Sequence, residues 1–184
     1  EIGLGIPAEP LFRSSILSEC GYDDTLFIFT SDNGPKVSDG YEDGARDAWA
    51  GENPAAPFRG GKYTVYEGGT RMPMIVTWPG RVKPGSVSHA LISQTDFARS
   101  LAKISGVDVP EGACGDSQEL SYVLLGESGA GRESLVEQPA WGPWGYRKGS
   151  WKLIDSGEPQ LYCLDDDPGE RNNLARECPE KLAE

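Results

Sequence analysis

The stretch that most constrains the fold is a short apolar run that ends in polar turn residues. Residues 26–29 read Leu-Phe-Ile-Phe, and residues 32–35, which follow closely, read Asp-Asn-Gly-Pro. A continuous apolar run closed by turn formers is typical of a strand buried on both faces, as in a parallel sheet. Burial of each of these side chains is worth about 1.5–3 kcal/mol, so we expect the run in the interior.

The polar residues after this strand indicate a ligand site. In open α/β sheets, ligands bind beyond the carboxyl ends of the strands, which is where Asp32 and Asn33 would lie. Their adjacent carboxylate and amide oxygens suit a hard cation such as Ca²⁺ or Mg²⁺. The same residues are also good turn formers, so this stretch alone leaves both interpretations open.

A second stretch combines glycine pairs with a lysine. Residues 58–62 read Phe-Arg-Gly-Gly-Lys, and residues 66–71 read Tyr-Glu-Gly-Gly-Thr-Arg. The glycine pairs allow the backbone to approach a ligand closely, while the flexible ammonium of Lys62 can reach it.

Seven stretches, taken in order, resemble the sulfatase family of the alkaline phosphatase-like superfamily. They read FTSDNGP, RGGK, YEGGTRMP, VTWPGRVKPG, QTDFARSLAKISG, GYRKGSWKLI and LYCLDDDPGERNNLA. The resemblance covers nearly all of residues 25–174. It implies an α/β fold: a partial alkaline phosphatase-like sheet with flanking helices over residues 1–126, the C-terminal part of the catalytic domain. A small antiparallel α+β C-terminal subdomain over residues 127–184 would follow.

The resemblance also implies a chemistry. Sulfatases hydrolyse sulfate esters with a formylglycine made from a Cys/Ser-x-Pro-x-Arg motif, while one divalent cation, usually calcium, polarises the sulfate oxygens. By this resemblance, Asp32 and Asn33 are metal ligands and Lys62 is the catalytic residue that contacts the sulfate. Arg59 lies near the substrate in the same pattern. The substrate would be an aryl or a carbohydrate sulfate.

Residues 35–57 form a long polar loop between the predicted metal and sulfate residues. A loop of this length in a compact domain is usually functional or disordered. The loop could form the rim of a substrate pocket, and Trp49 is the residue predicted to contact substrate there. A solvated insertion is the alternative, and we favour it slightly for the loop as a whole. Glu67 and Arg71 are expected to be a buried structural pair that holds the glycine loops.

The formylglycine motif itself has no counterpart. None of Cys20, Cys114, Cys163 and Cys178 begins such a motif, and the early Asp-Asp metal pair and active-site histidine of the family are also missing. We therefore expect a C-terminal portion of a sulfatase that lacks the N-terminal segment and is inactive alone. The cysteines show no Cys-x-x-Cys spacing, which argues against zinc, and free buried thiols are favoured over any of the possible disulfide pairings.

Charge and hydropathy exclude other classes of partner. The net charge of −12 argues against nucleic acid or an anionic membrane surface as partner. No apolar run is long enough to span a membrane, and no signal-peptide pattern is present. An extracytoplasmic location (periplasmic, secreted or lysosomal) is implied only by the resemblance, because members of the family usually work in these compartments.

Two other functions remain open. A phosphodiester or phosphonate hydrolase of the same superfamily can share the Asp-Asn pair, whereas the two-metal phosphatases tend to place a histidine where this chain has Asn33. A binding module for sulfated sugars that kept the anion pocket without the nucleophile is the non-enzymatic alternative.

Periodicity and turn residues predict the remaining elements. Residues 94–105 form a helix capped by Thr95 and closed by Gly106, and residues 165–170 form an acidic turn rather than a calcium loop. Closely spaced strands at the C-terminal end indicate an antiparallel meander. Helices are expected at residues 9–19, 120–125 and from 172 or 173 to 182, and strands at 74–78, 90–93, 134–137, 145–147, 151–154 and 160–163.

Overall fold

The computed structural model describes residues 19–38, 40, 42, 44–49 and 51–184. The helix predicted at residues 9–19 lies almost entirely outside them. Contacts divide the chain into two compact units, Glu1–Thr30 with Pro73–Gly131 and Ser31–Met72 with Arg132–Glu184. The domain boundary at residue 126 stays a prediction. None of the helices in the described part of the chain is long and apolar enough to cross a membrane.

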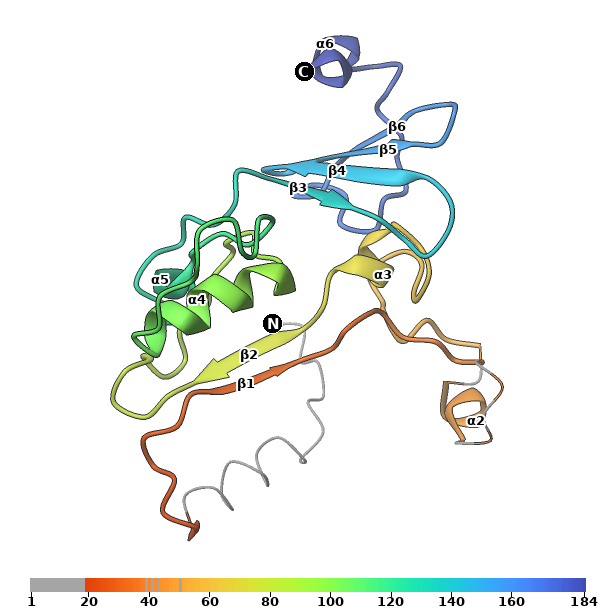
Figure 1. Ribbon diagram of the computed structural model, residues 1–184. Coiled ribbons are helices and arrows are strands. Elements are labelled where there is room, and N and C mark those ends of the chain that lie inside the picture. The colour runs from red at the N-terminus through yellow and green to blue at the C-terminus, as the bar shows by residue number, and fades with distance from the viewer. Residues whose placement is uncertain (1–18, 39, 41, 43, 50) are drawn as a thin grey trace. The chain divides into compact units, whose positions relative to one another are not determined.

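The first unit contains a two-stranded ribbon, in which β1 (Phe27–Thr30) pairs with β2 (Met74–Thr77) (Figure 1). The pairing is antiparallel and places Phe27 opposite Thr77. All four residues of β1 are only half-buried. The prediction of a parallel strand buried on both faces is therefore wrong here. The position of the strand was correct, but an apolar run reports burial and carries no information about the direction of its neighbour.

The helices of the first unit follow a short loop. A 3₁₀ turn, η1 (Gln94–Asp96), leads into α4 (Phe97–Ile104), and Gly106 closes the helix with a φ of 70°. The cap is Ser93 rather than Thr95. Its side chain accepts from the backbone N–H of Thr95, and the carboxylate of Asp96 accepts from the N–H of Ser93. These two hydrogen bonds form a capping box, and residues 90–93 belong to no strand, so the strand predicted there does not form.

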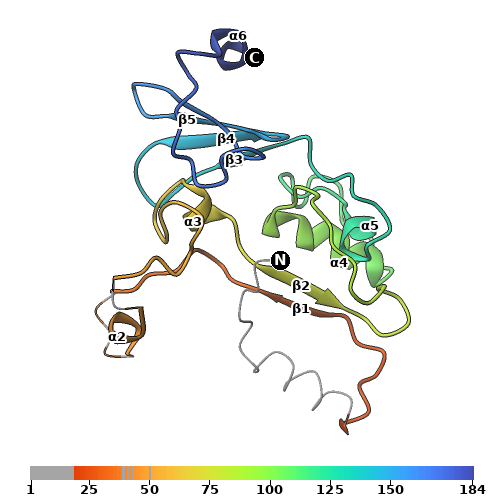
Figure 2. The same cartoon turned by 180° about the vertical axis from the view of Figure 1, so that it is seen from behind.

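Buried polar groups join α4 to α5 (Ser121–Leu124), which confirms the short helix predicted there. The hydroxyl of Ser100 accepts from the backbone N–H of Leu120 at 2.9 Å, and Asp96 Oδ1 accepts from that of Gln118 at 2.8 Å. Seen from behind, the two helices lie beside each other (Figure 2). The hydrogen bonds satisfy backbone groups that the loop before α5 would otherwise bury without partners.

The second unit is built on a four-stranded antiparallel meander in sequence order, as predicted (Figure 1). Its core cluster consists of Ile154 and Tyr162 from the sheet together with Val65 and Leu164. This sheet therefore buries part of the segment that carries the glycine pairs. The strands are β3 (Ser134–Glu137), β4 (Trp144–Lys148), β5 (Trp151–Asp155) and β6 (Gln160–Cys163), and the short helices of the unit are α2 (Ala45–Trp49), α3 (Glu67–Thr70) and α6 (Pro179–Ala183).

The C-terminal helix is shorter than predicted. It begins only at Pro179, a residue suited to the first turn. Asn173, one of the two predicted starts, instead fixes a turn to β6, because its side-chain oxygen accepts from the backbone N–H groups of Leu161 and Ala175, both at 3.0 Å. Asparagine is as good a turn former as a helix cap, and the tertiary contact decides between the two roles.

All four cysteines are free thiols, as favoured from the sequence. Cys20 and Cys114 are exposed, however, and the other two are half-buried, so none is a buried thiol.

Candidate active site

Two loops of the second unit carry most of the predicted site residues, and backbone hydrogen bonds hold these loops together. The N–H of Gly34 donates to the carbonyl of Gly69 at 3.1 Å, and the N–H of Lys62 donates to the carbonyl of Pro35 at 3.0 Å. The segment that follows β1, with Asp32 and Asn33, is thereby paired with the glycine loop that carries Lys62.

The glycines make this approach possible. A Cβ on Gly34 would collide with the carbonyl oxygen of Gly68, and a Cβ on Gly61 would lie 2.6 Å from the carbonyl oxygen of Pro35. A Cβ on Gly68 would lie 2.5 Å from the carbonyl of Arg59, the group to which the Gly68 N–H donates. The glycine pairs therefore serve backbone-to-backbone packing between the loops.

The predicted metal ligands differ in exposure. The side chain of Asp32 is exposed and that of Asn33 is half-buried, and the hydroxyl of Ser31 donates to the carbonyl of Asn33 at 3.0 Å. Carboxylate and amide oxygens are chemically suited to calcium, which takes roughly six to eight oxygen ligands. The donor types fit, and these residues would form part of such a shell. No group of three or more His, Cys, Asp or Glu side chains in the described ranges could hold a metal.

Lys62 is half-buried, and its ammonium lies 5.4 Å from the ring centroid of Tyr63. Trp49, predicted to line the substrate pocket, is exposed at the end of α2. The roles of both residues stay predictions.

Arg59 is held by the sheet of the same unit. Its guanidinium lies 3.9 Å from the ring centroid of Tyr66 and donates to the carbonyl of Glu170 at 3.1 Å and to the hydroxyl of Tyr162 at 3.3 Å. Burial raises the pKa of Tyr162, and the positive charge of Arg59 opposes that rise. The planar guanidinium thus has structural partners, and contact with substrate stays a prediction for it.

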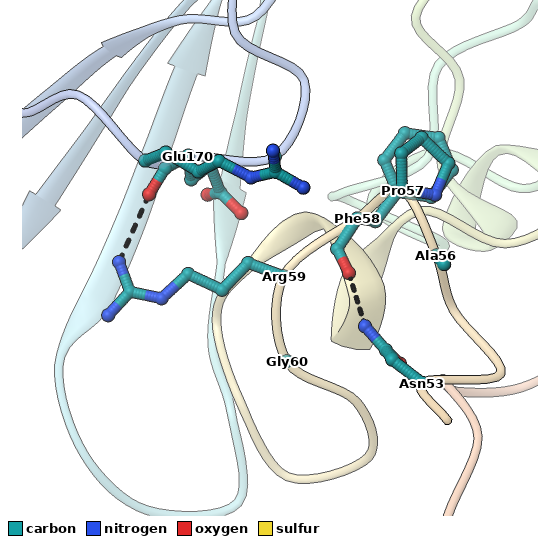
Figure 3. Close-up of a pocket in the computed structure, with 9 residues that line it drawn as sticks. Asn53, Ala56, Pro57, Phe58, Arg59, Gly60 and Glu170 are labelled. Carbon is teal, nitrogen blue, oxygen red and sulfur yellow. Dashed lines mark hydrogen bonds between the residues drawn. The ribbon is translucent and has the colours of Figure 1, made fainter. Parts of the chain in front are cut away.

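Arg59 also lines a pocket of about 610 Å³ (Figure 3). The backbone carbonyl of Glu170 faces Arg59 in this view, and the amide of Asn53 donates to the carbonyl of Phe58 at 2.7 Å. The pocket is lined by Asn53, Ala56, Pro57, Phe58, Arg59, Gly60, Gly169, Glu170 and Arg171.

A buried charge cluster, which was not predicted from the sequence, holds α3 against the sheet. The ammonium of Lys152 on β5 is fully buried and lies 3.0 Å from Glu67, 2.8 Å from Glu137 and 3.3 Å from Glu170. The second oxygen of Glu170 accepts from the backbone N–H of Glu67 at 2.7 Å. We call these four residues the Lys152 cluster.

The expected pair of Glu67 and Arg71 belongs to the edge of this cluster. Glu67 is fully buried as predicted, and Arg71 lies 3.4 Å from it, but the side chain of Arg71 is 43 % exposed. Arg147 approaches the same oxygen at 3.5 Å. The buried partner of Glu67 is therefore Lys152.

Electrostatics explain how an ammonium can be buried here. Desolvation lowers the pKa of Lys152, but the negative charges of Glu137, Glu67 and Glu170 outweigh it, and the net effect raises that pKa. Desolvation raises the pKa of Glu170, and the nearby Lys152 partly offsets this rise. The cluster is a paired set of charges that depends on its single ammonium.

The alternation of buried and half-buried residues along β5 carried a signal for this cluster. Lys152 and Ile154 lie two residues apart on β5 and share one buried face, while Trp151 and Leu153 are only half-buried. A lysine in phase with a core isoleucine indicates a buried cation that needs carboxylate partners. The identity of those partners, up to 85 residues away in sequence, required the fold.

Comparison with known proteins agrees with the loops and the fold. The profile of the sulfatase family matches residues 16–107. An N-acetylgalactosamine-6-O-sulfatase of Bacteroides thetaiotaomicron is 42 % identical over 88 % of this chain and 35 % of the relative. Human arylsulfatase A is 33 % identical over 83 % of this chain and 34 % of the relative. The chain belongs to the sulfatase family, and it spans about a third of the length of these curated relatives.

Solved structures extend this similarity to the fold. One solved structure, described in connection with the metabolism of multiple glycosaminoglycans by Bacteroides thetaiotaomicron, has a TM-score of 0.84 and 41 % identity. The match covers 93 % of this chain and 39 % of that chain. A structure in complex with its substrate D-glucosamine-2-N,6-O-disulfate has a TM-score of 0.70 and 27 % identity, covering 95 % and 35 %. The fold is thus a partial alkaline phosphatase-like α/β fold, as expected.

Proposed function

We propose that this chain is part of a sulfatase that hydrolyses the sulfate ester of a sulfated carbohydrate. Membership of the sulfatase family supports the reaction class. The carbohydrate class is supported by relatives named as N-acetylgalactosamine-6-sulfatases and by the similar structure in complex with a glucosamine disulfate. An extracytoplasmic location is part of the same proposal.

The observation that carries the proposal is the backbone pairing of the two loops. The hydrogen bonds from Gly34 to Gly69 and from Lys62 to Pro35 keep the Asp32–Asn33 segment beside the lysine. A sulfate ester is an anion, so the ammonium of Lys62 would bind its non-bridging oxygens and stabilise the charge that grows there in the transition state. Lys62 would provide this stabilisation as a positive charge held on a loop of fixed backbone.

Asp32 and Asn33 would hold one divalent cation, calcium or magnesium. Their oxygens match the ligand preference of hard cations, and the cation would supply Lewis-acid polarisation of the sulfate. Removal of the cation with a chelator is expected to weaken binding of N-acetylgalactosamine 6-sulfate, and Asp32→Ala should reproduce this loss in the presence of calcium.

The nucleophile of the proposed reaction is a formylglycine that is not among these 184 residues. No cysteine or serine of the chain starts a Cys/Ser-x-Pro-x-Arg motif. The chain alone should therefore bind the sulfated sugar without hydrolysing it. A metal-dependent release of sulfate by the 184-residue chain would contradict this part of the proposal.

Calorimetric titration of the chain with N-acetylgalactosamine 6-sulfate in calcium-containing buffer tests the binding site. Lys62→Ala should weaken binding at least about tenfold, because a charge-assisted contact is worth roughly 1.5–3 kcal/mol. Lys148→Ala removes an exposed lysine of β4 and serves as the matched control. Equal affinities of the wild type and Lys62→Ala would overturn the assignment. A preference for a phosphodiester over the sulfate ester would favour the phosphodiester hydrolase alternative.

A further inference from the structure

Two aromatic side chains of the second unit stack on each other while exposed. The rings of Tyr63 and Trp141 have centroids 4.9 Å apart and an interplanar angle of 20°. Tyr63 is 37 % exposed and Trp141 is 69 % exposed. Two rings stacked in this way cover each other's facing sides and leave their outer faces in contact with water, and exposed aromatic faces commonly mark binding sites.

Tyr63 adopts a backbone conformation that is unfavourable for its side chain. Its φ is 76°, in the left-handed region that glycine occupies without strain. The neighbouring residues Gly60 and Gly61 show that this loop uses glycine freely where the backbone requires it. A bulky ring kept at such a position points to a function of the ring itself, since glycine would fold more easily there.

Two lysines place positive charge beside this ring. The ammonium of Lys36 lies 5.7 Å from the ring centroid of Tyr63, and that of Lys62 lies 5.4 Å from it. Neither ammonium forms a salt bridge with a carboxylate of the described residues. In a chain with a net charge of −12, this is a local region of opposite sign. It therefore favours an anionic ligand.

We infer that Tyr63, Trp141 and Lys36 form a stacking platform for the sugar ring of a sulfated carbohydrate. The inference rests on the proposed function, because it takes Lys62 as the sulfate contact. The C–H groups on one face of a pyranose ring are weakly positive and would pack on the negative outer face of this aromatic stack. With the ring held there, the sulfate meets Lys62, and Lys36 meets the same sulfate or a second anionic group of the carbohydrate.

The platform explains a selectivity that Lys62 alone cannot provide. A lysine binds any anion of suitable size as a point charge, whereas a flat aromatic face adds affinity only for ligands with a ring. The aromatic platform thus selects a sulfated sugar over inorganic sulfate. Trp49, predicted from the sequence as the substrate aromatic, stays a separate prediction.

The test uses three variants of the whole chain and three probes. Tyr63→Gly removes one ring and relieves the backbone, so the loop should keep its conformation, and Trp141→Ala removes the other ring from an exposed position. Trp144→Ala removes an exposed tryptophan of β4 outside the platform and is the matched control. The probes are N-acetylgalactosamine 6-sulfate, unsulfated N-acetylgalactosamine and inorganic sulfate, titrated in calcium-containing buffer.

We expect Tyr63→Gly and Trp141→Ala each to bind N-acetylgalactosamine 6-sulfate about three- to tenfold more weakly than the wild type. Their affinity for inorganic sulfate should be unchanged, as should all affinities of Trp144→Ala. A stability measurement of Tyr63→Gly guards against misfolding, because this variant should be at least as stable as the wild type.

The inference and the proposed function can fail separately. If both ring variants bind the sulfated sugar as the wild type does while Lys62→Ala does not, the platform is wrong and the sulfate site stands. If Tyr63→Gly loses inorganic sulfate as strongly as the sulfated sugar, the ring only supports the loop, and the platform is again overturned. If the wild type binds neither N-acetylgalactosamine 6-sulfate nor inorganic sulfate, the platform and the proposed function are both overturned.

Discussion

Replacement of Lys152 by methionine is the most direct test of how the glycine loop is held. The ammonium of Lys152 is the only positive group within 3.3 Å of Glu67, Glu137 and Glu170 in the described structure. Methionine has a similar length and no charge, so it fills most of the volume and leaves the carboxylates without their cation.

The structure indicates how large the effect should be. Glu67 would keep its contacts with Arg71 at 3.4 Å and Arg147 at 3.5 Å. Among the described residues, Glu137 and Glu170 would keep only neutral donors, the hydroxyl of Thr70 at 3.3 Å and the backbone N–H of Glu67 at 2.7 Å. Removal of one partner from a buried ion pair costs about 3–5 kcal/mol, because the remaining charge stays desolvated. This is a large fraction of the roughly 5–15 kcal/mol that stabilises a typical domain.

Urea unfolding followed by circular dichroism measures this loss of unfolding free energy. Lys148→Met, on the neighbouring strand, removes a half-exposed lysine whose contact with Glu133 is 4.0 Å, and should change stability by less than about 0.5 kcal/mol. The double variant Lys152→Met/Glu137→Gln should recover part of the loss, because it neutralises one of the carboxylates left unpaired.

The reasoning would be refuted if Lys152→Met lost less than about 1 kcal/mol, as a surface substitution does. It would also be refuted if the added Glu137→Gln change destabilised the protein further, since the penalty would then not come from unpaired charge.

Three further predictions concern pH, packing and substrate contact. The pKa of Lys152 is raised above 10.5 in the folded state. The stability that Lys152 contributes is therefore complete below that pH and is lost as the pH rises through the folded-state pKa. In urea titrations at alkaline pH, the unfolding free energy should decline more steeply with pH for the wild type than for Lys152→Met. In a thermal unfolding assay, Gly34→Ala should destabilise the protein by about 2 kcal/mol or more, because the new Cβ would meet the backbone of Gly68 and Gly69. Gly115→Ala is the control, and it should be close to neutral because there is open space around Gly115. Trp49→Ala should raise KM for the sulfate ester in an enzyme form that supplies the formylglycine; an unchanged KM would remove Trp49 from the pocket.

The sequence by itself determined the family, the positions of most strands and the loops that carry the candidate site. The meander of β3 to β6 was predictable because closely spaced β-favouring runs, with turn residues and no helix between them, leave antiparallel hairpins as the natural connection. The helix at residues 97–104 was predictable because its apolar period and terminal glycine agree. These signals are local: each is carried by residues within one element or its immediate flanks.

Tertiary structure decided what depends on residues far apart. Antiparallel pairing of β1, the use of Asn173 in a turn rather than a helix, the Lys152 cluster and the stack of Tyr63 on Trp141 all join segments that no local pattern relates. The physical reason is that a strand's direction, a buried charge's partner and a ring's neighbour are set by which surfaces meet in space. Local sequence can indicate that a partner is needed, and only the folded chain supplies it.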